Sequence, residues 1–173
     1  MSGRLPLFAD PIRLANTRFQ GNGTLALAGM RRLAPSLFGD NGAVEVALSA
    51  GMEQGRAVLH GHLKGRLSLQ CQRCLEAVPL EVDHAFSLAV VACEDEIAAL
   101  PPACEPLLNR GEEIALADVF EDELLLLLPI VPMHEAGACG AAPVAAGTVV
   151  TAGPEQRKKP FADLKKMLSE SKS

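Results

Sequence analysis

Two stretches of alternating apolar and polar residues flank a Cys-x-x-Cys motif, Cys71 to Cys74, near the middle of the chain. Before the motif, leucines recur at 59, 63, 67 and 69, with glycine or polar residues between them. After it, apolar residues alternate with polar ones from 78 to 90. A side-chain period of two is typical of a strand with one buried face. The chain is therefore predicted to form an antiparallel β-hairpin that carries the two cysteines at its tip.

The expected register of this hairpin places Gln70 opposite Leu75. Apolar residues then meet on one face, with Leu67 opposite Val78, Leu63 opposite Val82 and Leu59 opposite Phe86. On the other face, opposite charges pair across the strands, with Lys64 opposite Glu81 and His62 opposite Asp83. Arg66 and Arg73 face no acid in this register.

The rest of the expected domain is a sheet with one helix. Shorter alternating runs on the N-terminal side predict further strands. Residues 117–128 carry apolar side chains at helical spacing, and Pro129 ends the pattern. Asp118 followed by Glu121 suggests a capping box at the helix start. We therefore expect an α+β domain over residues 1–135, in which one helix covers a mainly antiparallel sheet or partly closed barrel.

The composition changes after this domain. Residues 136–153 are mostly Ala, Gly, Val and Thr and carry no charge, which is typical of a flexible linker. The short segment 160–168 then has apolar residues on one side and lysines on the other. Residues 136–173 are thus predicted to be a flexible linker and tail with one short amphipathic segment.

Cysteine usage and hydropathy indicate a cytoplasmic protein. The chain has five cysteines and no basic start followed by an apolar segment, which would mark a secretory signal. The longest apolar run, Leu124 to Val131, is far too short to span a membrane. No phosphate loop, Ser/His/Asp triad or His-Glu-x-x-His pattern occurs. We expect neither catalysis, nor a small-molecule substrate, nor a membrane partner.

Charge is unevenly distributed along the chain. Residues 1–75 carry nine Lys/Arg and four Asp/Glu, a balance of +5, and residues 136–173 carry six and three, a balance of +3. Residues 76–135 carry one base and fourteen acids, a balance of −13. Such asymmetry is typical either of segments with different partners or of an acidic, solvated surface.

Cys71 and Cys74 have the spacing of half a tetrahedral zinc site, and zinc is the one cofactor that the chain suggests. A second pair of ligands would come best from His134 and Cys139, because the helix before them should pack back on the sheet of the hairpin.

Three other interpretations of the cysteines stay open. Cys93 with Cys104 is another possible second pair, although their spacing matches no common ligand pair. The motif at the hairpin tip can also be a compact turn without metal. A redox-active thiol pair is the third interpretation, but such enzymes place the motif before a helix rather than between two strands.

The candidates for contact with RNA phosphates are the basic residues that face no predicted acid. They are Arg66 and Arg73 on the hairpin, and Lys158 and Lys159 in the tail. Lys64 and His62, in contrast, are expected to be neutralised by the acids opposite them.

Four segments, in this order, make the chain resemble the bacterial YceD family, known as the large ribosomal RNA subunit accumulation proteins. They are the start around Asp10-Pro11, the segment 69–75 with the two cysteines, the stretch 118–134 from the helix through the prolines, and the closing Lys-Pro-Phe segment 159–164. The resemblance implies a role in the synthesis, processing or stability of large-subunit (23S) ribosomal RNA, without enzymatic activity.

The leading hypothesis is a non-catalytic ribosome-biogenesis factor that contacts a ribosomal RNA precursor, a ribosomal protein or a processing enzyme. The acidic stretch 76–135 favours a basic ribosomal protein over naked RNA. One alternative is a zinc-knuckle module that binds RNA directly. The other is a thiol redox protein that uses the Cys-x-x-Cys motif.

Overall fold

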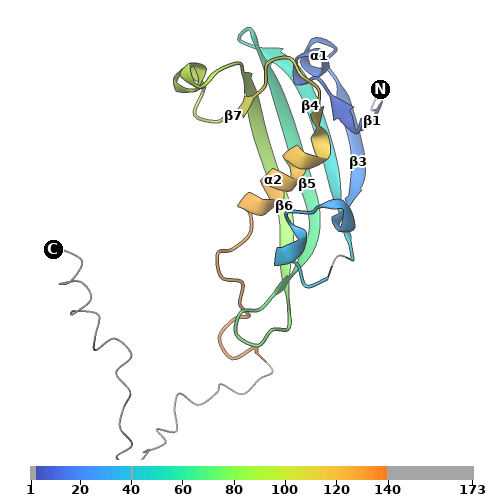
Figure 1. Ribbon diagram of the computed structural model, residues 1–173, viewed down its shortest axis with the longest axis vertical. Coiled ribbons are helices and arrows are strands. Elements are labelled where there is room, and N and C mark those ends of the chain that lie inside the picture. Colours follow the sequence, from blue (N-terminus) through green and yellow to red (C-terminus); the bar gives the residue numbers. More distant parts are fainter. Residues whose placement is uncertain (1–2, 40, 140–173) are drawn as a thin grey trace, which may run out of the picture. The chain divides into compact units, whose positions relative to one another are not determined.

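The structure is a computed structural model, which describes residues 3–39 and 41–139 (Figure 1). Its main element is a six-stranded sheet in the order β1-β3-β4-β5-β6-β7. The strands are β1 (Gly3–Arg4), β3 (Gln20–Ala26), β4 (Ala43–Glu53), β5 (Arg56–Gln70), β6 (Ala77–Val91) and β7 (Glu105–Leu108). The central pairs are antiparallel, whereas β1 pairs with β3 and β7 with β6 in parallel.

The remaining elements are short. They are β2 (Phe8–Ala9), which pairs with β8 (Ile114–Ala115), the helices α1 (Pro11–Asn16) and α2 (Leu116–Leu126), and the 3-10 turns η1 (Leu27–Gly29), η2 (Ala34–Ser36) and η3 (Glu94–Ala99). The α+β class and the covering helix are confirmed. The sheet is open, because no described strand joins β1 to β7, so the alternative of a partly closed barrel is not observed.

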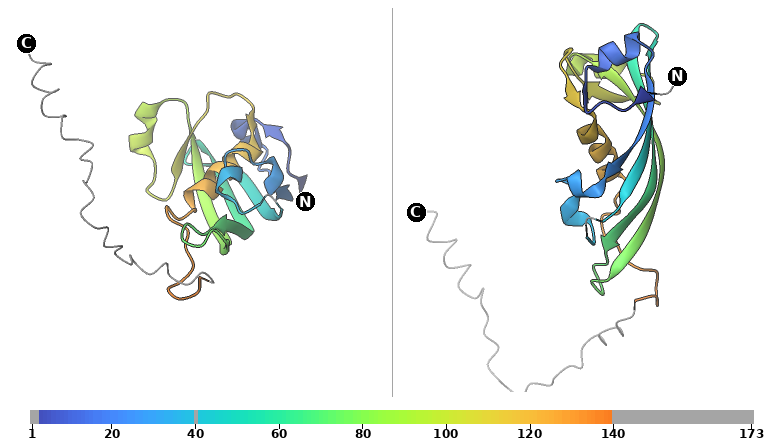
Figure 2. Two further views of the ribbon diagram at one scale, coloured as in Figure 1. Left: turned by 60° about the horizontal axis from the view of Figure 1, so that its bottom comes forward. Right: turned by 90° about the vertical axis from the view of Figure 1, so that its right-hand side faces the viewer.

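The sheet is curved, and α2 crosses its concave side together with the segment that contains η1 and η2 (Figure 2). The apolar row of β5 lies beneath the helix. Leu59, Leu63 and Leu67 are fully buried and belong to one core with Phe120 and Leu124 of α2. Each such side chain contributes about 2 kcal/mol through burial of apolar surface. The period of two therefore predicted the buried face correctly.

The hairpin formed by β5 and β6 is confirmed, but its expected register is wrong by two residues. Lys64 lies opposite Asp83, and Arg66 lies opposite Glu81. The faces are unchanged, because a shift of two residues returns every side chain to the same side of the sheet. The loop is longer than expected: the last strand pair is Gln70 with Ala77 rather than Gln70 with Leu75.

The expected capping box of α2 is also wrong. The helix begins at Leu116, two residues before Asp118, and no side chain caps it. Instead, the backbone N–H of Leu116 donates to the carbonyl oxygen of Leu7 (3.1 Å), so the segment before β2 satisfies this helix end. Glu121 points away from the helix start and bonds to the loop before η2.

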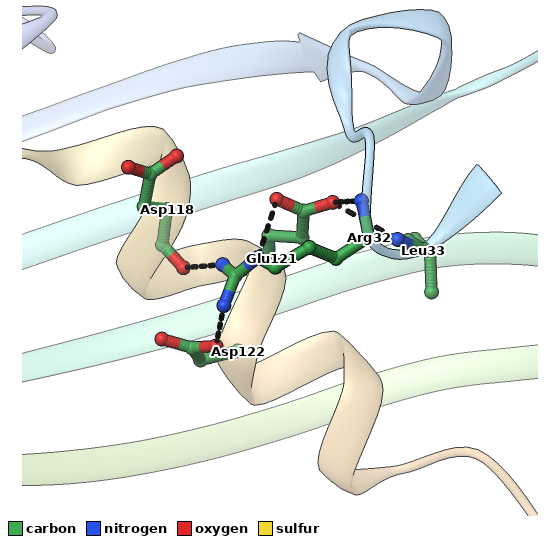
Figure 3. Close-up of polar contacts among 5 residues, drawn as sticks. All are labelled: Arg32, Leu33, Asp118, Glu121 and Asp122. Atoms are coloured by element: carbon green, nitrogen blue, oxygen red, sulfur yellow. Dashed lines mark hydrogen bonds and ion pairs between the residues drawn. The ribbon is translucent and has the colours of Figure 1, made fainter.

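Glu121 fixes this loop to the helix (Figure 3). One carboxylate oxygen accepts the backbone N–H groups of Arg32 (2.7 Å) and Leu33 (2.9 Å), and the other accepts the Nε–H of Arg32 (3.3 Å). Arg32 also bonds to the side chain of Asp122 and to the carbonyl oxygen of Asp118. Glu121 thus joins the helix to a loop that lies 88 to 89 positions earlier in the sequence, and this contact closes one side of the core.

The structure describes only the first four residues of the predicted linker and tail, 136–173. Residues 136–139 belong to the described structure, whereas the rest of the predicted linker and tail, with the segment 160–168, lies outside it. Within the described ranges, no helix combines the length and the apolar content that a crossing of the bilayer requires.

Candidate metal centre

The loop at the tip of the β5–β6 hairpin presents the first two cysteines. The backbone N–H of Cys71 donates to the carbonyl oxygen of Glu76 (2.9 Å), which continues the ladder by one pair. Inside this pair, the N–H of Leu75 donates to the carbonyl oxygen of Cys71 (2.8 Å), and Leu75 adopts a left-handed conformation with φ of 63°. The resulting tight turn holds the Cys71 and Cys74 side chains on the same side of the loop, toward the segment after α2.

The segment after α2 supplies the other two candidates. Its helix ends before Pro129, and the extended chain then reaches the hairpin tip, where Gln72 donates its backbone N–H to the carbonyl oxygen of Pro132 (2.9 Å). This bond places His134 and Cys139 beside the cysteines of the loop. The spatial grouping expected from the sequence is therefore observed.

The four side chains bring their ligand atoms within 4.8 Å of one another. The Sγ atoms of Cys71 and Cys139 are 3.8 Å apart, and the Nδ1 atom of His134 is 3.4 Å from the Sγ of Cys74 and 3.7 Å from that of Cys139. A tetrahedral zinc site with Zn–S bonds of about 2.3 Å and Zn–N bonds of about 2.1 Å has S···S edges of about 3.8 Å and S···N edges of about 3.6 Å. The one S···S distance and the two S···N distances given above match the edges of such a site.

The orientation of the imidazole also suits a metal ligand. Nε2 of His134 lies 3.0 Å from the carbonyl oxygen of Ala77, which can only accept a hydrogen bond. Nε2 therefore carries the proton, and Nδ1 turns its lone pair toward the three thiols. A backbone acceptor on the non-ligating nitrogen is the usual way in which proteins orient a metal-binding histidine.

Backbone groups around the cluster favour a thiolate. Burial raises the pKa of the Cys71 thiol, but hydrogen bonds from the backbone N–H groups of Cys74, His134 and Arg73 outweigh it and lower this pKa to about 5. Hydrogen bonds to the thiols of Cys71 and Cys139 raise the pKa of His134. The surroundings thus favour a thiolate at Cys71. At Cys74 the backbone N–H of Glu76 lowers the pKa, but burial and the hydrogen bonds with Cys71 and Cys139 outweigh it and raise the pKa. A metal that binds here displaces the remaining protons from sulfur and imidazole.

Arg73, a candidate for RNA contact, is part of this cluster. Its Nε donates to the Sγ of Cys139 (2.9 Å), and one terminal nitrogen donates to the carbonyl oxygens of His134 (3.3 Å) and Glu135 (3.2 Å). The hydrogen bond from this guanidinium to Cys139 raises the pKa of Arg73. Reasoning from the hairpin register missed this role, because the partners lie more than sixty positions further along the chain.

The other predicted site residues do not join the cluster. Arg66, expected to face no acid, forms an ion pair with Glu81 (3.2 Å) across the hairpin. Cys93 lies beside Glu96 instead of a second thiol (3.9 Å). Lys158 and Lys159 lie outside the described residues.

Two histidines on the outer face of β5 also have acidic partners. Nε2 of His62 is 2.7 Å from Asp83, and Nε2 of His60 is 2.6 Å from Glu53. The hydrogen bond with His62 lowers the pKa of Asp83. Acids therefore pair with His60, His62 and Arg66 on this face, while Lys64 lies opposite Asp83, whose carboxylate bonds to His62.

Comparisons with known proteins agree with the resemblance noted in the sequence. The family model described as "Large ribosomal RNA subunit accumulation protein YceD" matches residues 59–168, which include all four residues of the cluster. A protein of Haemophilus influenzae with the same description is 36% identical over 138 residues, which cover 79% of each chain. No solved structure matches the chain significantly.

Proposed function

The chain belongs to the YceD family of large ribosomal RNA subunit accumulation proteins, and from this membership we propose that it is a non-catalytic factor in ribosome biogenesis. In this role it supports the synthesis, processing or stability of large-subunit ribosomal RNA in the cytoplasm. It does so by holding a partner, and the cluster at the hairpin tip has a structural rather than a chemical task.

The proposal includes a zinc ion held by Cys71, Cys74, His134 and Cys139. Three thiols with one imidazole form a closed donor set, which leaves no open position for a substrate and is typical of structural zinc. When bound, zinc supplies a cross-link between the loop and the segment after α2. The guanidinium of Arg73 offsets the excess negative charge that three thiolates leave on a divalent ion.

The cluster geometry also argues against the thiol redox alternative. Cys71 is fully buried, so its sulfur cannot reach a disulfide in another protein. Its neighbours are a histidine and a third cysteine rather than the start of a helix. These features suit a metal ligand better than a nucleophile.

The partner that we propose is a basic ribosomal protein of the large subunit. The observation that carries this proposal is that three basic residues of the hairpin are already engaged: Arg66 faces Glu81, His62 faces Asp83, and Arg73 is occupied by the cluster. RNA binding requires cations that are free to contact phosphates. Between residues 76 and 135 the chain carries fourteen acids and one base, and although Glu121 and Glu123 are buried, this excess of negative charge attracts a basic protein.

Metal analysis of the purified full-length protein tests the zinc site. We expect one zinc per chain, and a Cys139→Ser variant that loses most of it. Cys93→Ser is the matched control, because Cys93 lies outside the cluster and its variant should retain zinc. A protein that carries no zinc after purification under reducing conditions, and takes up none, would show that the four side chains form a metal-free turn.

Binding assays with separated components test the partner. The protein is titrated with purified large-subunit ribosomal proteins and, separately, with a transcript of the 23S precursor. We expect binding to at least one basic ribosomal protein and none to the transcript at physiological salt. Tight, steeply salt-dependent binding to the transcript alone would instead support the zinc-knuckle RNA-binding module.

A further inference from the structure

One edge of the sheet has no partner along most of its length. β6 has fifteen residues, and β7 pairs only with its last four, Leu88–Val91. Figure 1 shows β7 beside only one end of β6, while α2 lies over the face of the sheet. Among the described residues, no strand pairs with β6 on this side between 77 and 87. A long unpaired edge is a template for the addition of another strand.

The pattern of hydrogen bonds tells which residues offer free backbone groups. The Cys71–Glu76 pair is hydrogen-bonded, and bonded and non-bonded pairs alternate along an antiparallel ladder. The backbone N–H and C=O groups of the even-numbered residues of β6 therefore bond to β5. Those of Glu81, Asp83 and Ala85 point away from β5, toward the open edge in the plane of the sheet. No hydrogen bond found within the described ranges ends on these groups.

Two residues near the hairpin tip agree with this assignment. Ala77, also odd-numbered, turns its carbonyl oxygen outward, where it accepts from His134. Pro79 has no N–H. Because Pro79 is also odd-numbered, this missing N–H would have faced the open edge, so β5 loses no hydrogen bond. The open part of the edge is thus bounded by Pro79 at one end and by β7 at the other.

The side chains on the two faces set the chemistry of an added strand. On the outer face, Glu81 and Asp83 are carboxylates at alternate positions. Each pairs with a basic residue of β5, Arg66 or His62, yet 76% and 69% of these side chains stay exposed, so each carboxylate can contact a second cation. On the concave face, Leu80 packs against the core while remaining half-buried, and His84 is half-buried beside it. A strand that fits here carries basic residues on one side and apolar residues on the other.

The same acids oppose pairing with a second copy of this chain. Two copies joined antiparallel by their β6 edges around Val82 would place Glu81 of each opposite Asp83 of the other. Like charges directly opposite each other destabilise a strand pair. A homodimer through this edge is therefore disfavoured, while a basic strand is favoured by the same carboxylates.

We propose that the open edge of β6, from Glu81 to Ala85, binds an extended segment of a partner protein in which basic and apolar residues alternate. This proposal rests on the proposed function, because it takes the partner to be a basic protein of the large subunit. The backbone supplies the hydrogen bonds of the added strand, and the two carboxylates select its charge.

Amide hydrogen exchange by NMR tests the site, with an octapeptide of alternating valine and lysine as the probe. In the free protein we expect the amides of Val82 and His84 to be protected and those of Glu81, Asp83 and Ala85 to exchange rapidly. Saturating peptide should slow the exchange of these three amides. Unchanged exchange, or new protection confined to other strands, would refute the site.

Charge-reversed variants test the selection. Replacing Glu81 and Asp83 together by Lys turns two attractive contacts into repulsive ones, and we expect peptide affinity to fall about ten-fold. The double variant Glu45→Lys with Glu53→Lys is the control, because β4 lies inside the sheet and its variant has the same net charge. Equal loss in both variants would show that only overall charge matters and would overturn the proposal.

Comparison with ribosomal proteins separates the two proposals. If the peptide binds at β6 but no large-subunit protein binds the chain, the edge site stands and the proposed partner falls. If a ribosomal protein binds and the Glu81/Asp83 variant retains full affinity for it, the proposed function stands and the edge site falls.

Discussion

Replacing Glu121 by alanine removes the contact that holds the loop before η2 against α2 (Figure 3). The carboxylate is buried, and one of its oxygens accepts the backbone N–H groups of both Arg32 and Leu33. The N–H of Leu33 is buried and has no route to water once its acceptor is lost. That of Arg32 is only partly buried and can be hydrated in the variant.

These contacts give the size of the effect. A buried donor left without a partner costs about 1–3 kcal/mol, and a charged acceptor makes the lost bond stronger than a neutral one. We therefore expect Glu121→Ala to lower the free energy of unfolding by about 3 kcal/mol at neutral pH. Glu121→Gln keeps an oxygen where both N–H groups point, so it should lose only about 1 kcal/mol.

Urea denaturation of the full chain measures these differences. Asp118→Asn is the matched control on the same helix: Arg32 bonds to the backbone carbonyl of Asp118, not to its carboxylate, so stability should change by less than about 0.5 kcal/mol. If Glu121→Ala loses no more than this control, the loop is not held by the carboxylate. If Glu121→Gln is as unstable as Glu121→Ala, the ion pair rather than the backbone contact carries the stability.

The pH dependence gives a second check on the same contact. Burial raises the pKa of Glu121, but the N–H groups of Leu33 and Arg32 outweigh it and hold the pKa below its usual value of 4.5. The charged carboxylate thus stabilises the fold above that value, and the stabilisation is lost as the pH falls through the lower folded-state pKa. The difference between wild type and Glu121→Ala should shrink over that range, and a constant difference would contradict the assignment.

Three further predictions concern other parts of the domain. Arg73→Ala should release zinc to a chelator about ten-fold faster, because loss of a group that hydrogen-bonds to a metal ligand weakens metal binding by about 10-fold or more, whereas Arg66→Ala should not. Gly61→Ala should destabilise the fold by about 2 kcal/mol in urea, because its Cβ would overlap the aromatic ring opposite it on β6, while Gly51→Ala meets open space and should have little effect. Burial raises the pKa of Glu123 above 4.5, so the protonated carboxyl stabilises the fold below that pH and this stabilisation is lost as the pH rises through the raised value. Between acidic and neutral pH, the free energy of unfolding should therefore fall more in the wild type than in Glu123→Gln. Parallel pH profiles of the two proteins would refute this.

Much of the candidate metal site could be predicted from local sequence. The alternation on both sides of the motif placed Cys71 and Cys74 at a hairpin tip, and the helix before Pro129 suggested that His134 and Cys139 would return to it. The structure brings these four side chains together. The role of Arg73 could not be predicted in this way, because its partners are carbonyl oxygens and a sulfur on a distant segment without regular structure.

The charge pairing on the hairpin shows where local reasoning fails. A period of two defines which face a residue occupies but is identical for every even shift between two strands. The register therefore depends on the length of the loop, and the expected loop was two residues too short. With the observed register, Arg66 gains Glu81 as its partner, and a residue that appeared free to bind phosphate is neutralised.

The sequence alone determined the alternating strands, the apolar face that they bury and the helix that covers it, because these features repeat over a few neighbouring residues. Only the tertiary structure decided the register of the hairpin, the turn of Glu121 toward Arg32 and Leu33, and the unpaired edge of β6. Each of these features depends on contacts between segments that are distant in the sequence, and local periodicity carries no information about such contacts.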